Sequence, residues 1–92
     1  MRSKPKERNI EGKSSLLNDY CLVLFNDDTN KYEYVVECLI DICKHDPVQA
    51  EQCTFIAHHK GKCDIKMGSF DQLEEMKHEF DRRGINTLIY QN

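Results

Sequence analysis

The side chains best suited to binding chemistry form an acidic triplet, Asn26-Asp27-Asp28, directly after an apolar run at residues 20–25. One amide and two carboxylates place several hydrogen-bond acceptors close together, an arrangement that suits a positively charged group. Further along the chain a second pattern ends in His58-His59, and an unprotonated imidazole nitrogen is another acceptor. If the fold brings His58 to the triplet, these residues predict a binding site for a cationic group.

Several other roles are open to the same residues. The triplet could simply form an Asx turn and a helix cap, and His58 could be a histidine favourably placed at a helix C-terminus. The triplet lacks the glycine and distal glutamate of an EF-hand. His58, His59 and Cys63 have no fourth ligand at a usual zinc spacing. We therefore expect no metal and no cofactor.

The five cysteines are an odd number and contain no CxxC pair. Four of them occupy apolar positions of expected strands or helices, which is typical of buried, reduced thiols in a cytosolic protein. The thiols nearest His58 in sequence, Cys53 and Cys63, lie in apolar patterns, whereas a nucleophilic cysteine is exposed and has a lowered pKa. We do not expect an enzyme.

Length and composition describe one ordinary globular domain. The chain has 92 residues, of which 39% are hydrophobic and 32% charged, enough for a single modest core. No apolar stretch approaches the ~20 residues of a membrane span, and no signal-peptide hydrophobic region is present. We expect a cytoplasmic protein with no membrane partner.

Charge is distributed unevenly along the chain. Residues 1–18 contain five basic and two acidic side chains and so have a net charge of +3. Because the net charge of the whole chain is −3, the remaining residues have a net charge of −6. Affinity for nucleic acid depends on clustered Lys and Arg, so we expect no nucleic-acid partner. The acidic remainder is better suited to basic groups, including the amino terminus of a peptide.

Periodicity predicts six elements. Residues 1–18 lack a regular pattern and are expected to be a flexible tail, followed by a domain at 19–92. Strands are expected at 20–25, at 62–67, where Cys63, Ile65 and Met67 share one face, and at 85–90. Three helices are expected: one from the cap Asn30 to about Lys44, one from the cap Asp46 to about Lys60, and one from the cap Ser69 to about Arg83. The second helix is expected to be apolar at Ala50, Cys53, Phe55, Ile56 and Ala57.

The element order is therefore β-α-α-β-α-β. With so few elements, the economical solution is an α+β fold in which three helices cover one face of a small three-stranded antiparallel sheet. In this fold the end of the first strand and the end of the second helix can meet.

Several segments match a known family in element order and spacing. They are Val23-Leu24-Phe25-Asn26-Asp27-Asp28, Glu33-Tyr34-Val35, Asp46, Ala50 and Ala57-His58-His59-Lys60-Gly61-Lys62. From about Tyr20 to Leu88 the chain resembles the ClpS-type adaptors, which hand N-degron substrates to a Clp-family AAA+ unfoldase and its partner protease. The resemblance implies N-degron peptides and that unfoldase as partners. It also implies that the N-terminal extension takes part in delivery.

The resemblance implies an α-amino clamp made of Asn26, Asp27 and His58. It also implies a neighbouring pocket for the first side chain of the substrate, lined by Asn30, Tyr32, Val35, Thr54, Ala57 and Leu88. The family commonly has methionine at the positions of Tyr32 and Thr54 and valine at that of Ala57. These changes alter the shape and polarity of the pocket that in the family takes Leu, Phe, Tyr or Trp.

The unfoldase-binding side is expected on the third helix, where Asp71, Glu75 and Lys77 resemble the family's acidic residue and Glu-x-Lys stretch. Because the pocket departs from the family pattern, a second function stays open. The protein could be a ClpS-like regulator that binds the unfoldase without reading N-degrons.

Overall fold

The computed structural model describes residues 19–92, so the tail predicted at residues 1–18 lies outside the described residues. The elements follow the predicted order. They are β1 (Tyr20–Phe25), α2 (Tyr32–Cys43), α3 (Pro47–Lys60), β2 (Lys62–Gly68), α4 (Phe70–Arg82) and β3 (Thr87–Gln91).

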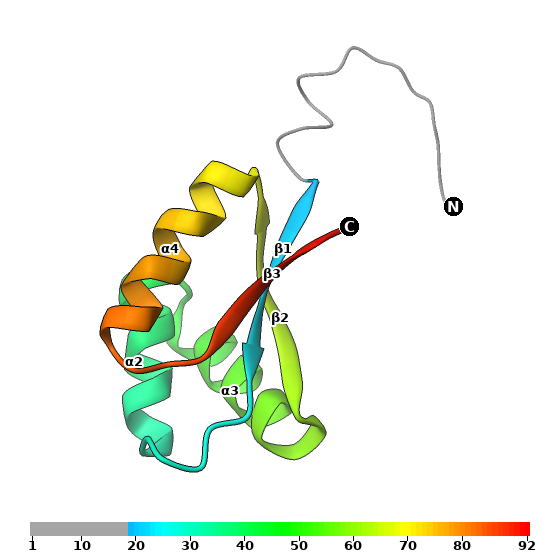
Figure 1. Cartoon of the computed structure of the whole chain (residues 1–92). Helices are drawn as coiled ribbons and strands as arrows, with labels where there is room; N and C mark the ends of the chain where they lie inside the picture. The colour runs from blue at the N-terminus through cyan, green and yellow to red at the C-terminus, as the bar shows by residue number, and fades with distance from the viewer. Residues whose placement is uncertain (1–18) are drawn as a thin grey trace.

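The strands form one antiparallel sheet in the order β2-β1-β3, so that β1 is the central strand. Figure 1 shows the three helices gathered on one side of this sheet. Leu22 and Leu24 of β1 are buried in the core between the sheet and the helices. Leu39 of α2 and the α4 residues Leu73 and Phe80 are buried with them. The predicted α+β architecture is confirmed.

Two of the three predicted helix caps are confirmed. The Asp46 carboxylate accepts a hydrogen bond from the Gln49 backbone N–H at 2.8 Å, and the Ser69 hydroxyl oxygen accepts one from Gln72 at 3.2 Å. The prediction of Asn30 as a cap is wrong. The N-cap of α2 is Lys31, which makes no side-chain cap bond, because the Asn30 side chain is used in tertiary contacts.

A β-bulge changes the alternation of β2. Leu22 of β1 pairs with Lys66 while Val23 pairs with Asp64, which leaves Ile65 as the extra residue. An extra residue shifts the inward–outward alternation of a strand by one position. Ile65 is buried as predicted, but Met67 is 54% exposed, so the expectation that these two residues share a face is wrong.

Helix α3 also differs from its predicted apolar side. Phe55 and Ile56 are exposed, and the buried side consists of the small residues Ala50, Cys53, Thr54 and Ala57. Small side chains let a helix approach its neighbours closely, which large ones at the same positions would prevent.

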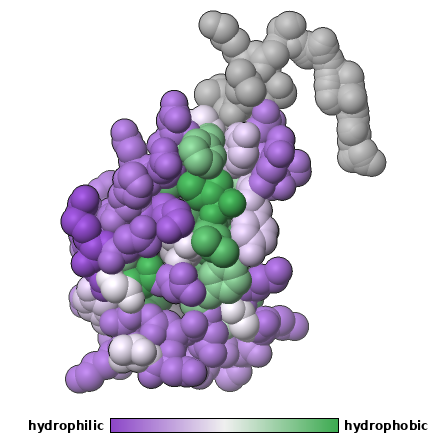
Figure 2. Space-filling model, viewed as in Figure 1, coloured by the Kyte–Doolittle hydropathy of each residue, from purple (hydrophilic) through white to green (hydrophobic). Residues whose placement is uncertain are grey.

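The molecular surface is mainly hydrophilic over the helices, and Figure 2 shows a hydrophobic band running along the strands. Within residues 19–92, no helix combines the length and the apolar character needed to cross a lipid bilayer.

Candidate functional site

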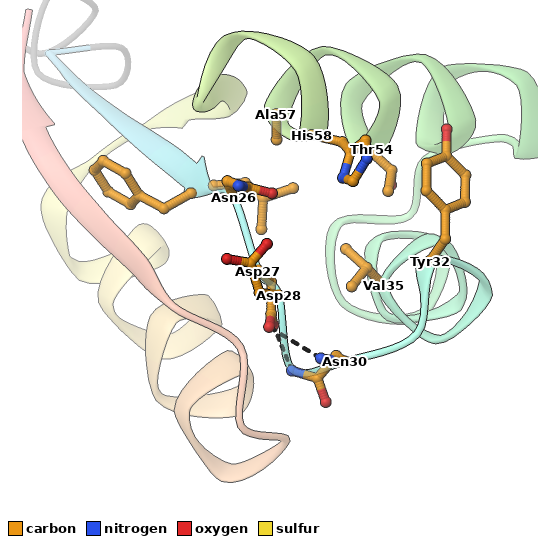
Figure 3. A pocket seen from close by; sticks show the side chains of 11 residues that line it. Asn26, Asp27, Asp28, Asn30, Tyr32, Val35, Thr54, Ala57 and His58 are labelled. Atoms are coloured by element: carbon orange, nitrogen blue, oxygen red, sulfur yellow. Dashed lines mark hydrogen bonds between the residues drawn. The ribbon is translucent and has the colours of Figure 1, made fainter.

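A pocket of about 220 Å³ opens where the end of β1, the loop after it, the start of α2 and the second half of α3 converge. Figure 3 shows the residues of the loop on one side of this space and those of the two helices on the other. Its lining residues are Leu24, Phe25, Asn26, Asp27, Asp28, Asn30, Tyr32, Val35, Thr54, Ala57 and His58.

A backbone hydrogen bond joins the two halves of the site. The Asn26 N–H donates to the Gly61 carbonyl at 2.9 Å, and the Gly61 N–H donates to the Ala57 carbonyl, also at 2.9 Å. Gly61 ends α3 with φ +98°, in the left-handed region that favours glycine. The end of β1 is thereby attached to the last turn of α3, which carries His58.

Asp27 organises the loop. One carboxylate oxygen accepts hydrogen bonds from the Thr29 N–H at 2.8 Å and the Asn30 N–H at 3.0 Å, and the other accepts one from the Asn30 side-chain amide. This is the Asx-turn role expected of an aspartate in a loop. A carboxylate has about four acceptor positions, so three bonds leave capacity for one more donor.

The loop is also attached to a segment that is distant in sequence. The side-chain amide of Asn30 donates to the Gly84 carbonyl at 2.9 Å, in the turn between α4 and β3. Asn30 therefore connects the Asp27 carboxylate to this turn, which explains why its side chain does not cap α2.

The electrostatic state of Asp27 follows from these contacts. Partial burial tends to raise the pKa of its carboxyl group, but the hydrogen bonds from Asn30 and Thr29 outweigh burial and lower the pKa below its ordinary value. Asp28 also lines the pocket, and its exposed carboxylate accepts no hydrogen bond from residues 19–92. The pocket rim thus carries two acidic side chains, Asp27 and Asp28.

We expect the loop to weaken the fold in acid. The Asp27 pKa is about 3.9 in an unfolded chain and lower in the folded protein. The charged carboxylate therefore contributes stability above the unfolded pKa, and this contribution is lost as the pH falls through the folded pKa. Urea unfolding from pH 7 to pH 2 should show wild type losing its advantage over Asp27→Asn as the pH falls. A constant difference across this range would contradict the assignment.

Tyr32 forms part of the pocket wall on the α2 side. Its hydroxyl donates to the Glu51 carbonyl of α3 at 3.3 Å, and its ring lies edge-on to the His58 ring at a centroid distance of 6.2 Å. Burial and the nearby Glu51 carboxylate raise the pKa of Tyr32, which keeps its hydroxyl protonated. Tyr32 thus connects the two helices and contacts the imidazole of the site.

The α3 wall is less polar than the sequence suggests. The Thr54 hydroxyl donates to the Ala50 carbonyl one turn earlier at 2.8 Å, a common bond for threonine inside a helix. The Thr54 hydroxyl proton is therefore already used in a hydrogen bond within α3. Ala57 is buried beside it, and Val35 is buried on the opposite wall.

The structure brings together eight of the nine residues expected at the clamp and its pocket. Leu88 is the exception, because it pairs with Val23 and is exposed. The neighbouring pair of the ladder, Leu24 and Thr87, is buried. Successive strand residues point to opposite faces, so Leu88 lies on the face of the sheet away from the helices. Its expected role as a pocket wall is wrong.

Three lining residues are outside the set that the family resemblance implies: Leu24, Phe25 and Asp28. All three are sequence neighbours of Asn26 and Asp27. Their position where β1 passes into the loop was the sequence signal that could have identified them as lining residues.

The residues predicted for unfoldase binding lie elsewhere, on α4. Asp71 and Glu75 are exposed, and Lys77 forms an ion pair with Asp81 at 3.2 Å. None of the three predicted residues lines the pocket, so their role stays a prediction.

Metal and thiol chemistry find little support in the described residues. Within residues 19–92, no three His, Cys, Asp or Glu side chains are grouped so as to hold a metal ion. Four cysteines are buried and Cys63 is half-buried, all as free thiols. Burial raises the pKa of Cys43 and of Cys63 to about 12, which disfavours the nucleophilic thiolate.

The fold and the site together define a small α+β domain with a preformed, acceptor-rich pocket, as in a ligand-binding module. The sequence signature of the ATP-dependent Clp protease adaptor protein ClpS matches residues 16–86. The chain therefore belongs to the ClpS family and is an adaptor of the Clp protease.

A solved structure supports the fold. The structure of Agrobacterium tumefaciens ClpS2 bound to L-phenylalaninamide matches with a TM-score of 0.69 and 18% sequence identity, covering 79% of this chain and 95% of ClpS2. No curated protein matches the chain in sequence.

Proposed function

We propose that this adaptor binds its substrates through a free N-terminal residue and delivers them to a Clp-type AAA+ unfoldase for degradation. The observation that carries the proposal is the position of Asn26, Asp27 and His58 around one pocket of about 220 Å³. These acceptors come from two separate parts of the chain, joined through the bond between Asn26 and Gly61.

The chemistry of the rim suits an α-ammonium group. A peptide amino terminus has a pKa of about 7.7 to 8.0 and three donors when charged. The Asn26 side-chain oxygen, the remaining acceptor position of Asp27 and an unprotonated nitrogen of His58 can accept all three. Each such charge-assisted bond contributes about 1.5 to 3 kcal/mol, enough to distinguish a chain end from an internal residue.

The interior of the pocket suits an apolar first side chain. Leu24, Val35 and Ala57 supply carbon surface, and the Thr54 hydroxyl is already bonded within α3. The ligand of ClpS2, L-phenylalaninamide, has both features, a free amino group and an apolar side chain, and thereby supports the proposal.

The partners and compartment follow from the same proposal. The unfoldase contacts α4 through Asp71, Glu75 and Lys77, and no nucleic acid or membrane takes part. The unpaired cysteines are consistent with a reducing cytoplasmic compartment.

Blocking the amino terminus should weaken binding at least about tenfold, because acetylation removes the charge that strengthens the bonds to the rim. Fluorescence anisotropy with peptides that begin with Leu, Phe, Tyr or Trp, each with a free or an acetylated terminus, measures this directly. Equal binding of both forms would contradict the proposal. If the protein binds the unfoldase but binds no member of a library of peptides with different N-terminal residues, the alternative function, a regulator that does not read N-degrons, is favoured.

A further inference from the structure

A row of rings leads from the pocket to the outer surface of α3. Tyr32 contacts His58, His58 lies 5.1 Å from His59 at an interplanar angle of 89°, and His59 lies 4.1 Å from Phe55 at 44°. These four residues, here called the ring row, begin at the pocket wall and end at a side chain that is 53% exposed.

The core does not require the exposed end of the ring row. Helix α3 packs through Ala50, Cys53, Thr54 and Ala57, so Phe55 and His59 contribute nothing to the buried side. Single exposed apolar residues are common on proteins, but an exposed aromatic ring continuous with a pocket is typical of a binding surface.

The helix geometry places Phe55 nearer than Ile56 to His58, the pocket residue from which the ring row leaves. At about 100° per residue, Phe55 lies roughly 60° from His58 around the helix axis. By the same measure, Ile56, which is 40% exposed, lies roughly 160° from His58. Of the two exposed apolar side chains of this turn, Phe55 is thus the nearer to His58 around the helix.

We propose that Phe55 and His59 form a subsite for an apolar or aromatic side chain at the second or third position of the bound peptide. This inference rests on the proposed function, since the first residue must occupy the pocket. The ring centroids lead away from His58 in steps of 5.1 and 4.1 Å. An extended peptide, which advances about 3.3 Å per residue, covers that path in two to three residues.

The test uses the full-length protein and peptides with a free N-terminal Phe. One set has Phe or Leu at positions two and three, and the other has Ser or Asp there. Wild type should bind the apolar set about three- to tenfold more tightly, as expected for one additional aromatic contact. Phe55→Ala should remove this preference, and Ile56→Ala, a matched change at an exposed apolar residue outside the ring row, should keep it.

Binding of L-phenylalaninamide separates the two proposals, because this ligand has no second residue. Phe55→Ala should bind the amide as wild type does. If wild type binds the amide but shows no preference at positions two and three, or if Ile56→Ala loses the preference as fully as Phe55→Ala, the subsite is disproved while the pocket stands. If wild type binds neither the amide nor any peptide, the proposed function itself fails.

Discussion

Asp27→Ala is expected to weaken binding of a peptide with a free amino terminus by at least about a hundredfold. The substitution removes one charge-assisted bond, worth about 1.5 to 3 kcal/mol, and each 1.4 kcal/mol corresponds to a factor of ten. It also removes the three hydrogen bonds that Thr29 and Asn30 donate to the carboxylate, so that the loop no longer holds Asn26 in place. Anisotropy measures the affinity, and urea unfolding should show a loss of about 1 to 3 kcal/mol.

Two further variants separate charge from loop structure. Asp27→Asn keeps an acceptor for the backbone N–H groups of Thr29 and Asn30 but removes the charge, so it should bind more weakly than wild type and more tightly than Asp27→Ala. Asp28→Asn removes a charge from the same rim without removing a hydrogen bond within residues 19–92. Since an exposed charge is well screened, its effect should stay below about fivefold. Full binding by Asp27→Ala would disprove the clamp.

Ala57→Leu is expected to close the side-chain pocket. Ala57 is 2% exposed and lines the pocket of about 220 Å³, so a larger side chain there occupies the space of the first residue of the peptide. Burial of a bulky apolar side chain contributes about 1.5 to 3 kcal/mol, so peptides beginning with Phe or Leu should lose roughly ten- to hundredfold in affinity. A peptide beginning with Ala should lose much less.

Thr54→Val provides the matched control for this pocket. The Thr54 hydroxyl donates to the Ala50 carbonyl and is not offered to a ligand, so the nearly isosteric valine should leave peptide affinity within about threefold. Overpacking by Ala57→Leu should cost about 1 to 3 kcal/mol of folding stability, and circular dichroism establishes whether the variant is folded. A folded Ala57→Leu protein with unchanged selectivity would place the first side chain elsewhere.

Much of the fold could be predicted because its signals are local. Asp46 with Pro47 and Ser69 with Gln72 are start signals within one turn of a helix, and the structure confirms both. Asn30 has a similar local signal, but its amide bonds to Asp27 and to Gly84, the latter 54 residues away in sequence. No pattern of neighbouring residues can reveal such a contact.

The errors on the strands also have nonlocal causes. Met67 is exposed because a bulge at Ile65 shifts the alternation, and a bulge becomes visible only in the pairing of two strands. The prediction of Leu88 as a pocket wall failed because β3 presents that residue to the opposite face of the sheet. The residues expected on the loop and helices line one pocket, because family spacing and element order together determine their positions.

The three bonds that hold the pocket walls have a consequence for binding kinetics. Asn26 is bonded to Gly61, Asn30 to Gly84 and Tyr32 to Glu51, so each wall is attached to a different part of the fold before any ligand arrives. A site that needs no rearrangement accepts different ligands at similar association rates. Discrimination among substrates should then lie in the lifetime of the complex, so that a poor substrate enters as readily as a good one and leaves sooner.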